Sequence, residues 1–159
     1  MKKYEFTGET KEIRLLFRTA TLHRIRATVA FGIVEVGDLG GWIEKEENLS
    51  HEGKAWVWGN AKVCGDAEVC GDAKVFSASH VLVIGAIGSR NDFTTFYRDK
   101  DNEITVKCGC FLGKIDRFLE KVTQTHGDSK YALVYRAAVE VAKLQIDLSG
   151  EAPKDADEE

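Results

Sequence analysis

A six-residue repeat is the feature of this sequence that most constrains its fold. Four successive units, AWVWGN, AKVCGD, AEVCGD and AKVFSA, occupy positions 55–78. Within each unit a short strand places its alanine and valine on one side and the residue between them on the other. The Gly-Asn or Gly-Asp pair that follows predicts a tight turn, because glycine adopts backbone angles that other residues avoid. Strands and corners that alternate at a fixed period predict a coil.

The flanking segments add a family resemblance. GDLGGWIE at 37–44 and NLS at 48–50 precede the repeat, and IGSRN at 87–91 follows it. Together with the repeat they resemble small hexapeptide-repeat proteins encoded by bacteriophages and prophages. The resemblance implies a left-handed parallel β-helix with three hexads per coil, assembly into a trimer, and a role in countering host defence. In such a coil Trp58 lies under Phe76 at the strand spacing of about 4.8 Å.

The rest of the chain predicts further elements. Residues 13–31 alternate in the manner of strands, and 93–98 with 104–108 form a hairpin. Ile115, Phe118, Leu119 and Val122 mark a helix, and a second helix follows Asp128 or Ser129. We therefore expect a mainly β fold with four parts. These are N-terminal strands that cap the coil (1–32), the left-handed β-helix (33–88), a β-hairpin with two α-helices (89–148) and an acidic disordered tail (149–159).

Charge and composition exclude several classes of protein. The formal charge is −4, but residues 1–150 carry equal numbers of acidic and basic side chains. A neutral body argues against coating of extended nucleic acid. No apolar run approaches the roughly 18 residues of a membrane span, so we expect no membrane partner and a place in the cytoplasm of an infected or lysogenic bacterial host. The four cysteines match no zinc spacing, so we expect reduced thiols, no metal and no cofactor.

Acyl transfer is one possible activity, because many hexapeptide-repeat proteins are acyltransferases that use acyl-CoA and a histidine base. The repeat register turns His80 outward, toward a neighbouring subunit, and turns His51 inward. His80 is therefore the best candidate for a catalytic base. A surface or interface histidine is the alternative, and the extended loop that folds over the acyl donor in such enzymes is missing. No other enzyme motif is present, and we assign no catalytic residue.

Recognition side chains are densest where the coil meets the hairpin. Arginine grips phosphate or carboxylate bidentately, hydroxyls add hydrogen bonds, and aromatic rings stack on bases. The expected ligand-binding set is Ser89, Arg90, Asn91, Thr94, Thr95, Tyr97, Arg98 and Lys107. A turn shaped by Ser89 and Asn91 is the structural alternative. A second anion-binding patch is expected at Arg18, His23, Arg24 and Arg26, with a solvated strand face as its alternative.

Three functions follow as hypotheses. In the first, a non-catalytic oligomer, a trimer by the resemblance, sequesters an anionic nucleotide-like molecule that serves as a host immune signal. In the second, the protein inhibits a host defence protein through a surface at Trp56, Trp58 and Phe76. In the third, it is an acyltransferase. The first requires binding alone, in keeping with the absence of an enzyme motif.

Overall fold

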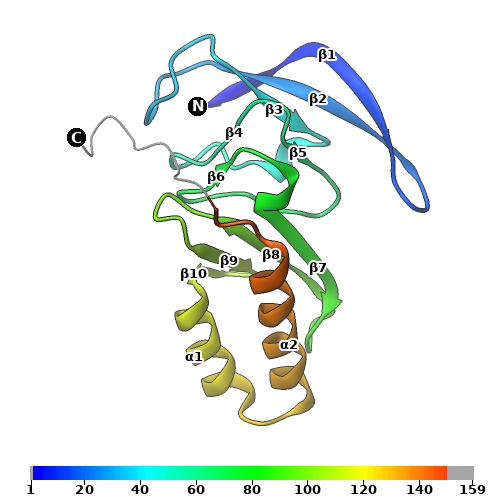
Figure 1. The fold of residues 1–159 in the computed structure, drawn as a ribbon, viewed down its shortest axis with the longest axis vertical. Coiled ribbons are helices and arrows are strands. Elements are labelled where there is room, and N and C mark those ends of the chain that lie inside the picture. Colours follow the sequence, from blue (N-terminus) through cyan, green and yellow to red (C-terminus); the bar gives the residue numbers. More distant parts are fainter. Residues whose placement is uncertain (1, 150–159) are drawn as a thin grey trace.

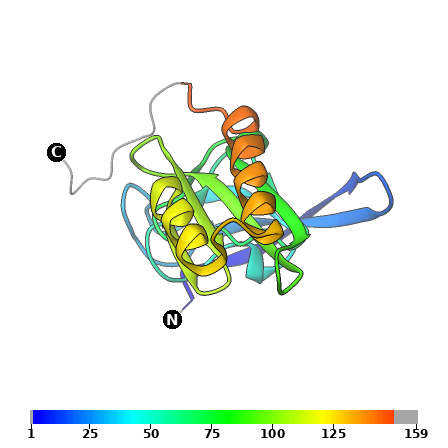
Figure 2. The same ribbon diagram turned by 90° about the horizontal axis from the view of Figure 1, so that it is seen from below.

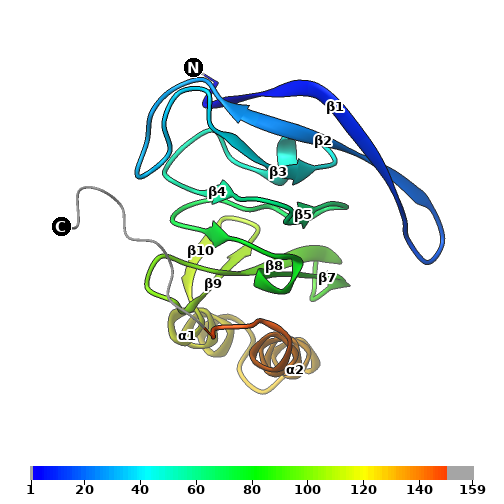
Figure 3. The ribbon, with the colours of Figure 1, turned by 45° about the horizontal axis from the view of Figure 1, so that its top comes forward.

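The computed structural model describes residues 2–149, which stack as layers. A long antiparallel hairpin lies at one end, the short strands of the repeat lie beneath it, and a second sheet follows, covered on its outer face by two helices (Figure 1; Figure 3). Figure 2 shows the two helices side by side across that outer face. The repeat is therefore enclosed between the N-terminal hairpin and the second sheet.

The first sheet has the order β1-β2-β3-β5. Strands β1 (Tyr4–Arg14), β2 (Thr19–Ala27) and β3 (Leu39–Ile43) pair antiparallel, and β5 (Lys62–Val63) joins β3 in parallel. The strands expected over 13–31 are present as the end of β1 and as β2. Their shared hairpin projects beyond the body of the molecule, and Leu16 and Phe17 at its tip are 88% and 94% exposed.

The repeat folds into short segments joined by tight turns. Strand β4 (Trp56–Val57) pairs in parallel with β6 (Lys74–Val75), and a single bridge joins Leu49 to Val69. The glycines that follow the strands have φ between 57° and 63°, as the Gly-Asn and Gly-Asp pairs predicted. Trp58 stacks on Phe76 with ring centroids 4.4 Å apart, so that expected contact is confirmed. The repeat alanines and valines are buried in the core, as predicted.

The predicted fold class, a left-handed parallel β-helix, is wrong. Most ladders are antiparallel. Of the parallel pairs between strands, β4–β6 joins two strands of two residues, and β3–β5 adds the two-residue strand β5 at one edge of the first sheet. The physical reason is strand length. The long strands β1, β2, β7 and β8 bury far more backbone in antiparallel hairpins than the repeat units can in parallel ladders. The result is a mixed β fold with two C-terminal helices.

The second sheet has the order β10-β9-β8-β7 and is antiparallel throughout. It comprises β7 (Val81–Ile87), β8 (Asp92–Arg98), β9 (Ile104–Cys108) and β10 (Phe111–Lys114). The β8–β9 pair confirms the hairpin expected over 93–108. Helices α1 (Ile115–His126) and α2 (Lys130–Gln145) also confirm their predictions, with Ser129 as the N-cap residue of α2. Strand β7 was missed, because its residues read as a weak continuation of the repeat.

Two hydrophobic cores lie on opposite faces of the second sheet. One core joins the repeat to β1 and β2 and includes Tyr97, whereas the other joins the sheet to α1 and α2 and includes Phe96. Trp56 is only 1% exposed, because Tyr4 and Phe31 cover it with ring centroids 6.2 and 5.3 Å away. The expected Trp56, Trp58 and Phe76 surface therefore lacks its first member.

Two short 3₁₀ turns, η1 (Glu46–Asn48) and η2 (Ala78–His80), complete the described elements. None of the helices within residues 2–149 is long and apolar enough to cross a membrane. Positions 150–159 of the expected acidic tail lie outside the described residues.

Lys3 is a buried amine that makes stability depend on pH. Its side chain is inside the core, 3% exposed, where Nζ donates a hydrogen bond to the Ala55 carbonyl at 2.7 Å and lies 4.7 Å from the centre of the Phe31 ring. Residues 2–149 provide no carboxylate within ion-pair distance of it. Burial therefore lowers the pKa of Lys3 from its ordinary value of 10.5 to about 8.

We expect the free energy of unfolding of Lys3→Met, compared with that of wild type, to be more favourable at neutral pH than at alkaline pH. Between the two pKa values the unfolded chain binds more protons than the native protein, so wild-type stability rises with pH across this window. The stability difference between Lys3→Met and wild type should shrink by about 2 kcal/mol from about pH 7 to about pH 9.5. Urea unfolding of both proteins at several pH values measures this difference. Tyrosines and cysteines titrate in both proteins, so their contributions cancel when the two free energies of unfolding are subtracted. A difference that does not change with pH would mean that Lys3 is not desolvated.

Candidate functional site

A pocket of about 360 Å³ lies where two strand turns meet the two helices. The β7–β8 turn, the β9–β10 turn, α1 and α2 all contribute to its wall, and we call it the helix–turn pocket. Its volume falls in the range of about 300–1,000 Å³ that is typical of small-molecule sites. The lining residues are Ser89, Arg90, Asp92, Cys108, Gly109, Cys110, Phe111, Phe118, Lys121, Val122, Thr125, His126 and Tyr135.

Two cationic side chains line this pocket from opposite elements. Arg90 comes from the β7–β8 turn and Lys121 from α1, and both residues are exposed. Neither is within ion-pair distance of a carboxylate among residues 2–149. Asp92 is the only carboxylate in the lining, and its Oδ1 accepts a hydrogen bond from the Phe93 amide at 2.7 Å. The cationic groups are therefore available to an anion.

Aromatic rings form the apolar wall of the pocket. Phe118 is buried, and its ring centroid lies 5.5 Å from that of Phe111 and 5.7 Å from that of Tyr135. The His126 ring stacks on Tyr135 at 5.8 Å. Burial, followed by the neighbouring Cys108 thiol, raises the pKa of Tyr135, so its hydroxyl stays protonated at neutral pH. The wall thus offers ring faces and one phenolic donor.

Backbone conformation at the β7–β8 turn places these groups. Asn91 has a φ of 49°, which asparagine tolerates better than most residues. Gly88 has a φ of 77°, and a Cβ built there would lie 1.9 Å from the Tyr135 hydroxyl. Glycine is therefore required at 88 for α2 to approach the turn, and this approach sets the distance between Arg90 and the rings.

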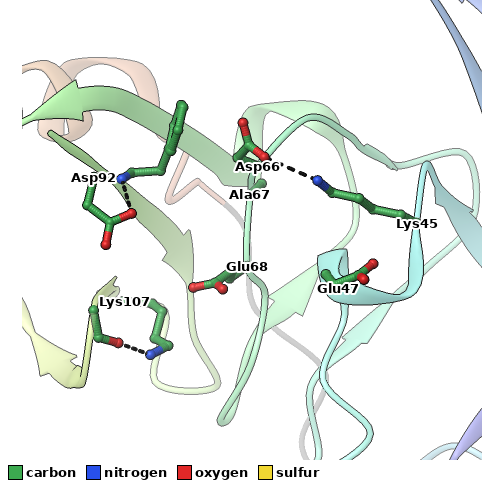
Figure 4. A pocket seen from close by; sticks show the side chains of 9 residues that line it. Lys45, Glu47, Asp66, Ala67, Glu68, Asp92 and Lys107 are labelled. Carbon is green, nitrogen blue, oxygen red and sulfur yellow. Dashed lines mark hydrogen bonds and ion pairs between the residues drawn. The ribbon is translucent and has the colours of Figure 1, made fainter.

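A second hollow of about 340 Å³ lies on the other side of Asp92 and Gly109 (Figure 4). Carboxylates of Glu47, Asp66, Glu68 and Asp92 line it, against the amines of Lys45 and Lys107. Lys45 pairs with Asp66 at 3.1 Å, and Lys107 donates to the Gly109 carbonyl. Within residues 2–149 no group of His, Cys, Asp or Glu side chains is arranged to hold a metal ion. Its acidic lining suits an anion poorly.

The expected ligand-binding set does not come together as a whole. Ser89 and Arg90 line the helix–turn pocket, Asn91 shapes the turn, and Lys107 lines the acidic hollow. The remaining four, Thr94, Thr95, Tyr97 and Arg98, are each at most 3% exposed.

These four buried residues hold the layers together. Thr94 Oγ1 donates to Cys108 Sγ at 3.3 Å, and Thr95 Oγ1 accepts from the Glu68 amide at 2.9 Å. Arg98 Nε donates to the Lys74 carbonyl at 3.2 Å. Tyr97 lies in the repeat core, where burial raises its pKa. Because they are buried, these four residues do not line the helix–turn pocket.

The expected second anion patch is neutralised residue by residue. Arg18 is paired with Glu44, and that hydrogen bond lowers the pKa of Glu44 to about 2. Arg26 pairs with Glu5 at 2.6 Å and Arg24 lies 3.6 Å from Glu9. His23 stacks on Phe6 at 4.5 Å. The arrangement fits the alternative of a solvated strand face.

His80 does not point outward, and this part of the acyl-transfer hypothesis is wrong. The residue is 7% exposed, and its Nδ1 accepts hydrogen bonds from the amides of Phe76 and Ser77 at 3.0 and 3.2 Å. Burial lowers its pKa. The imidazole closes the η2 turn. Its buried position is explained by the hydrogen bonds that it accepts from these two backbone amides.

Sequence analysis missed most of the pocket lining. Lys121 and Thr125 are one helical turn apart on α1, a spacing that places them on one face, and that signal was present. Nothing local in the sequence predicts that this face meets the β7–β8 turn. Tyr135 lies on the apolar side of α2, in the core beneath the second sheet, and it lines the pocket as well.

Comparisons with known proteins give no match, either to a protein-family model or to a curated protein. The identification as a small hexapeptide-repeat protein of the phage type is wrong, because no family model supports it and the sheets are mostly antiparallel. That resemblance alone implied the phage origin, the role against host defence and the trimer. These three expectations therefore have no remaining support.

Proposed function

We propose that this protein binds, without chemical turnover, a small anionic molecule that also carries a planar ring, such as a nucleotide. The observation that supports this is the composition of the helix–turn pocket, in which Arg90 and Lys121 face an aromatic wall. An anionic group and a ring are the two ligand features that such a lining recognises. The cytoplasmic location expected from the sequence belongs to the same proposal, and the four free cysteines are in keeping with it.

The division of labour in the pocket follows from side-chain chemistry. Arg90 offers a planar fork that binds two oxygens of a phosphate, and Lys121 adds a compact charge from the opposite wall. Phe111 and Tyr135 provide faces against which a base can stack. The Tyr135 hydroxyl and the Thr125 hydroxyl can donate to the ligand's polar edge.

Two thiols line the pocket, and the environment of the less exposed one, Cys108, favours binding over catalysis. A nucleophilic cysteine needs a base within hydrogen-bond reach. The Cys108 sulfur instead accepts a hydrogen bond from Thr94 and lies against the phenol of Tyr135. His126 also lines the pocket, but its ring is stacked on Tyr135. Both neighbours of the thiol are weak acids and not bases.

We expect Arg90→Ala to weaken binding of AMP by about tenfold to a hundredfold, the cost of losing a charged hydrogen bond. Isothermal titration with AMP and with adenosine separates the anionic group from the ring. Lys121→Ala should weaken AMP binding less, and neither substitution should affect adenosine strongly.

Lys107→Ala is the matched control, since it removes one cation from the neighbouring acidic hollow. It should leave AMP affinity unchanged. Equal losses from Lys107→Ala and Arg90→Ala would indicate nonspecific charge attraction. AMP binding that survives Arg90→Ala together with Lys121→Ala would refute the proposed site.

A further inference from the structure

Helix α2 has two apolar faces. Its inner face contributes Ala132, Tyr135, Ala138, Val139 and Ala142 to the core beneath the second sheet. A helix that covers a sheet normally presents polar side chains on the opposite face.

The outer face of α2 instead carries Leu133, Ala137, Val141 and Leu144. These residues recur every three or four positions, so they form one continuous row, which we call the α2 outer stripe. Leu133 is 61% exposed, Val141 47% and Leu144 89%. The row spans about three helical turns, roughly 16 Å.

The neighbouring helix α1 has no such apolar outer face, although it belongs to the same helical layer as α2. Helix α1 lies beside α2 on the same sheet (Figure 2). Its exposed residues are polar or charged, and they include Asp116, Arg117, Glu120 and Gln124. Only α2 therefore combines a buried inner face with an apolar outer face.

We propose that the α2 outer stripe binds the same stripe of a second copy of this chain, with the two helices antiparallel about a two-fold axis. A two-fold interface uses the same patch on both copies, so one self-complementary row suffices. With the axis midway along the stripe, Leu133 packs against Leu144 of the partner. Ala137 and Val141 then meet their counterparts near the axis, where the small alanine allows close approach.

Charge favours the antiparallel arrangement. Lys130 lies at the start of α2 and Asp147 lies just beyond its end, and both residues are exposed. The register that joins Leu133 to Leu144 sets the first turn of each helix, which carries Lys130, beside the C-terminal end of its partner, just beyond which Asp147 lies. Antiparallel helices also place the positive N-terminal end of each beside the negative C-terminal end of its partner. A parallel arrangement would set the two Lys130 side chains against each other.

Oligomeric state tests the proposal directly. Sedimentation velocity over loading concentrations from about 1 to 100 μM should show a dimer of the 17.7 kDa chain. Leu144→Lys and Leu133→Glu should each raise the dimer dissociation constant by at least about tenfold, because each places two charges in the apolar contact. A monomer at every concentration, or a dimer indifferent to both substitutions, would overturn the proposal.

The double variant determines the orientation. Combining Leu133→Glu with Leu144→Lys puts opposite charges across both ends of an antiparallel interface, so association should recover part of what each single variant loses. In a parallel pair like charges would meet, and the dimer of the double variant would be weaker than the dimer of either single variant. That result would overturn the antiparallel arrangement.

A matched control is available at the tip of the β1–β2 hairpin. Phe17 is 94% exposed and far from α2 in the fold, so Phe17→Glu should leave the dimer intact. Loss of the dimer on Phe17→Glu would place the interface at the hairpin and refute the role of α2. The proposal does not depend on the helix–turn pocket, and circular dichroism confirms that each variant is folded before association is compared.

Discussion

Replacing Trp56 with alanine should lower the free energy of unfolding by about 3–5 kcal/mol, a large share of what a domain of this size possesses. Trp56 is 1% exposed, and its ring meets Tyr4 and Phe31 edge-on. Truncation leaves a cavity between the N-terminal strands and the repeat, and backbone pairing on both sides prevents its collapse. Urea denaturation followed by circular dichroism measures the loss.

Trp58→Ala is the matched control, because it removes the same side chain from the next outward position of the repeat. Trp58 is half-buried and stacks on one ring, Phe76. We expect a loss of about 1–2 kcal/mol. If both substitutions cost the same, the N-terminal strands do not seal Trp56 from solvent.

Gly40→Ala should cost about 3 kcal/mol or more, because the strand has no room for the added methyl group. A Cβ at position 40 would lie 2.7 Å from Ile25 Cγ1, 2.7 Å from Trp56 Cζ2 and 2.8 Å from the Val57 carbonyl oxygen. The backbone atom cannot move without breaking the β4–β6 pairing, so strand β3 must shift. Thermal and urea unfolding both report the effect.

Two further variants test this explanation. Gly113→Ala adds the same methyl to another strand, where it meets only the edge of the Phe111 ring at 3.1 Å, and should cost less than about 1 kcal/mol. Combining Gly40→Ala with Trp56→Leu should cost less than the sum of the two changes, because the smaller side chain relieves one contact. Strict additivity would mean that Gly40 and Trp56 do not share the same space.

Local patterns in the sequence predicted the C-terminal elements well. The helical row from Ile115 to Val122 and the alternating residues of the 93–108 hairpin were read correctly, because each signal lies within one element. The turn glycines of the repeat were predicted for the same reason. Amphipathic periodicity is fixed by local geometry and survives any tertiary arrangement.

The overall architecture could not be obtained in this way. The repeat indicated how each unit bends, but not that β2 and β3 would pair antiparallel above it. The residues between alanine and valine were predicted only to lie on the opposite side of each strand, and two of them, Trp56 and Lys74, are each 1% exposed. Their burial comes from other layers, supplied by chain segments remote in sequence.

The candidate site shows the same limit. Ser89 and Arg90, predicted to bind a ligand, lie in an exposed turn between strands and line the helix–turn pocket. Thr94, Thr95, Tyr97 and Arg98 were assigned to the same ligand-binding set because recognition side chains are densest where the repeat meets the hairpin. In fact β8 is an inner strand of its sheet, with the repeat on one face and the helices on the other, so both faces are buried.

This shared strand has a consequence for how the molecule holds together. Tyr97 belongs to one hydrophobic core and Phe96, its immediate neighbour, to the other. If either core opens, β8 loses one of its two walls, and the other core becomes exposed through the same strand. The N-terminal and C-terminal parts are therefore coupled thermodynamically, and neither melts as an independent cooperative unit.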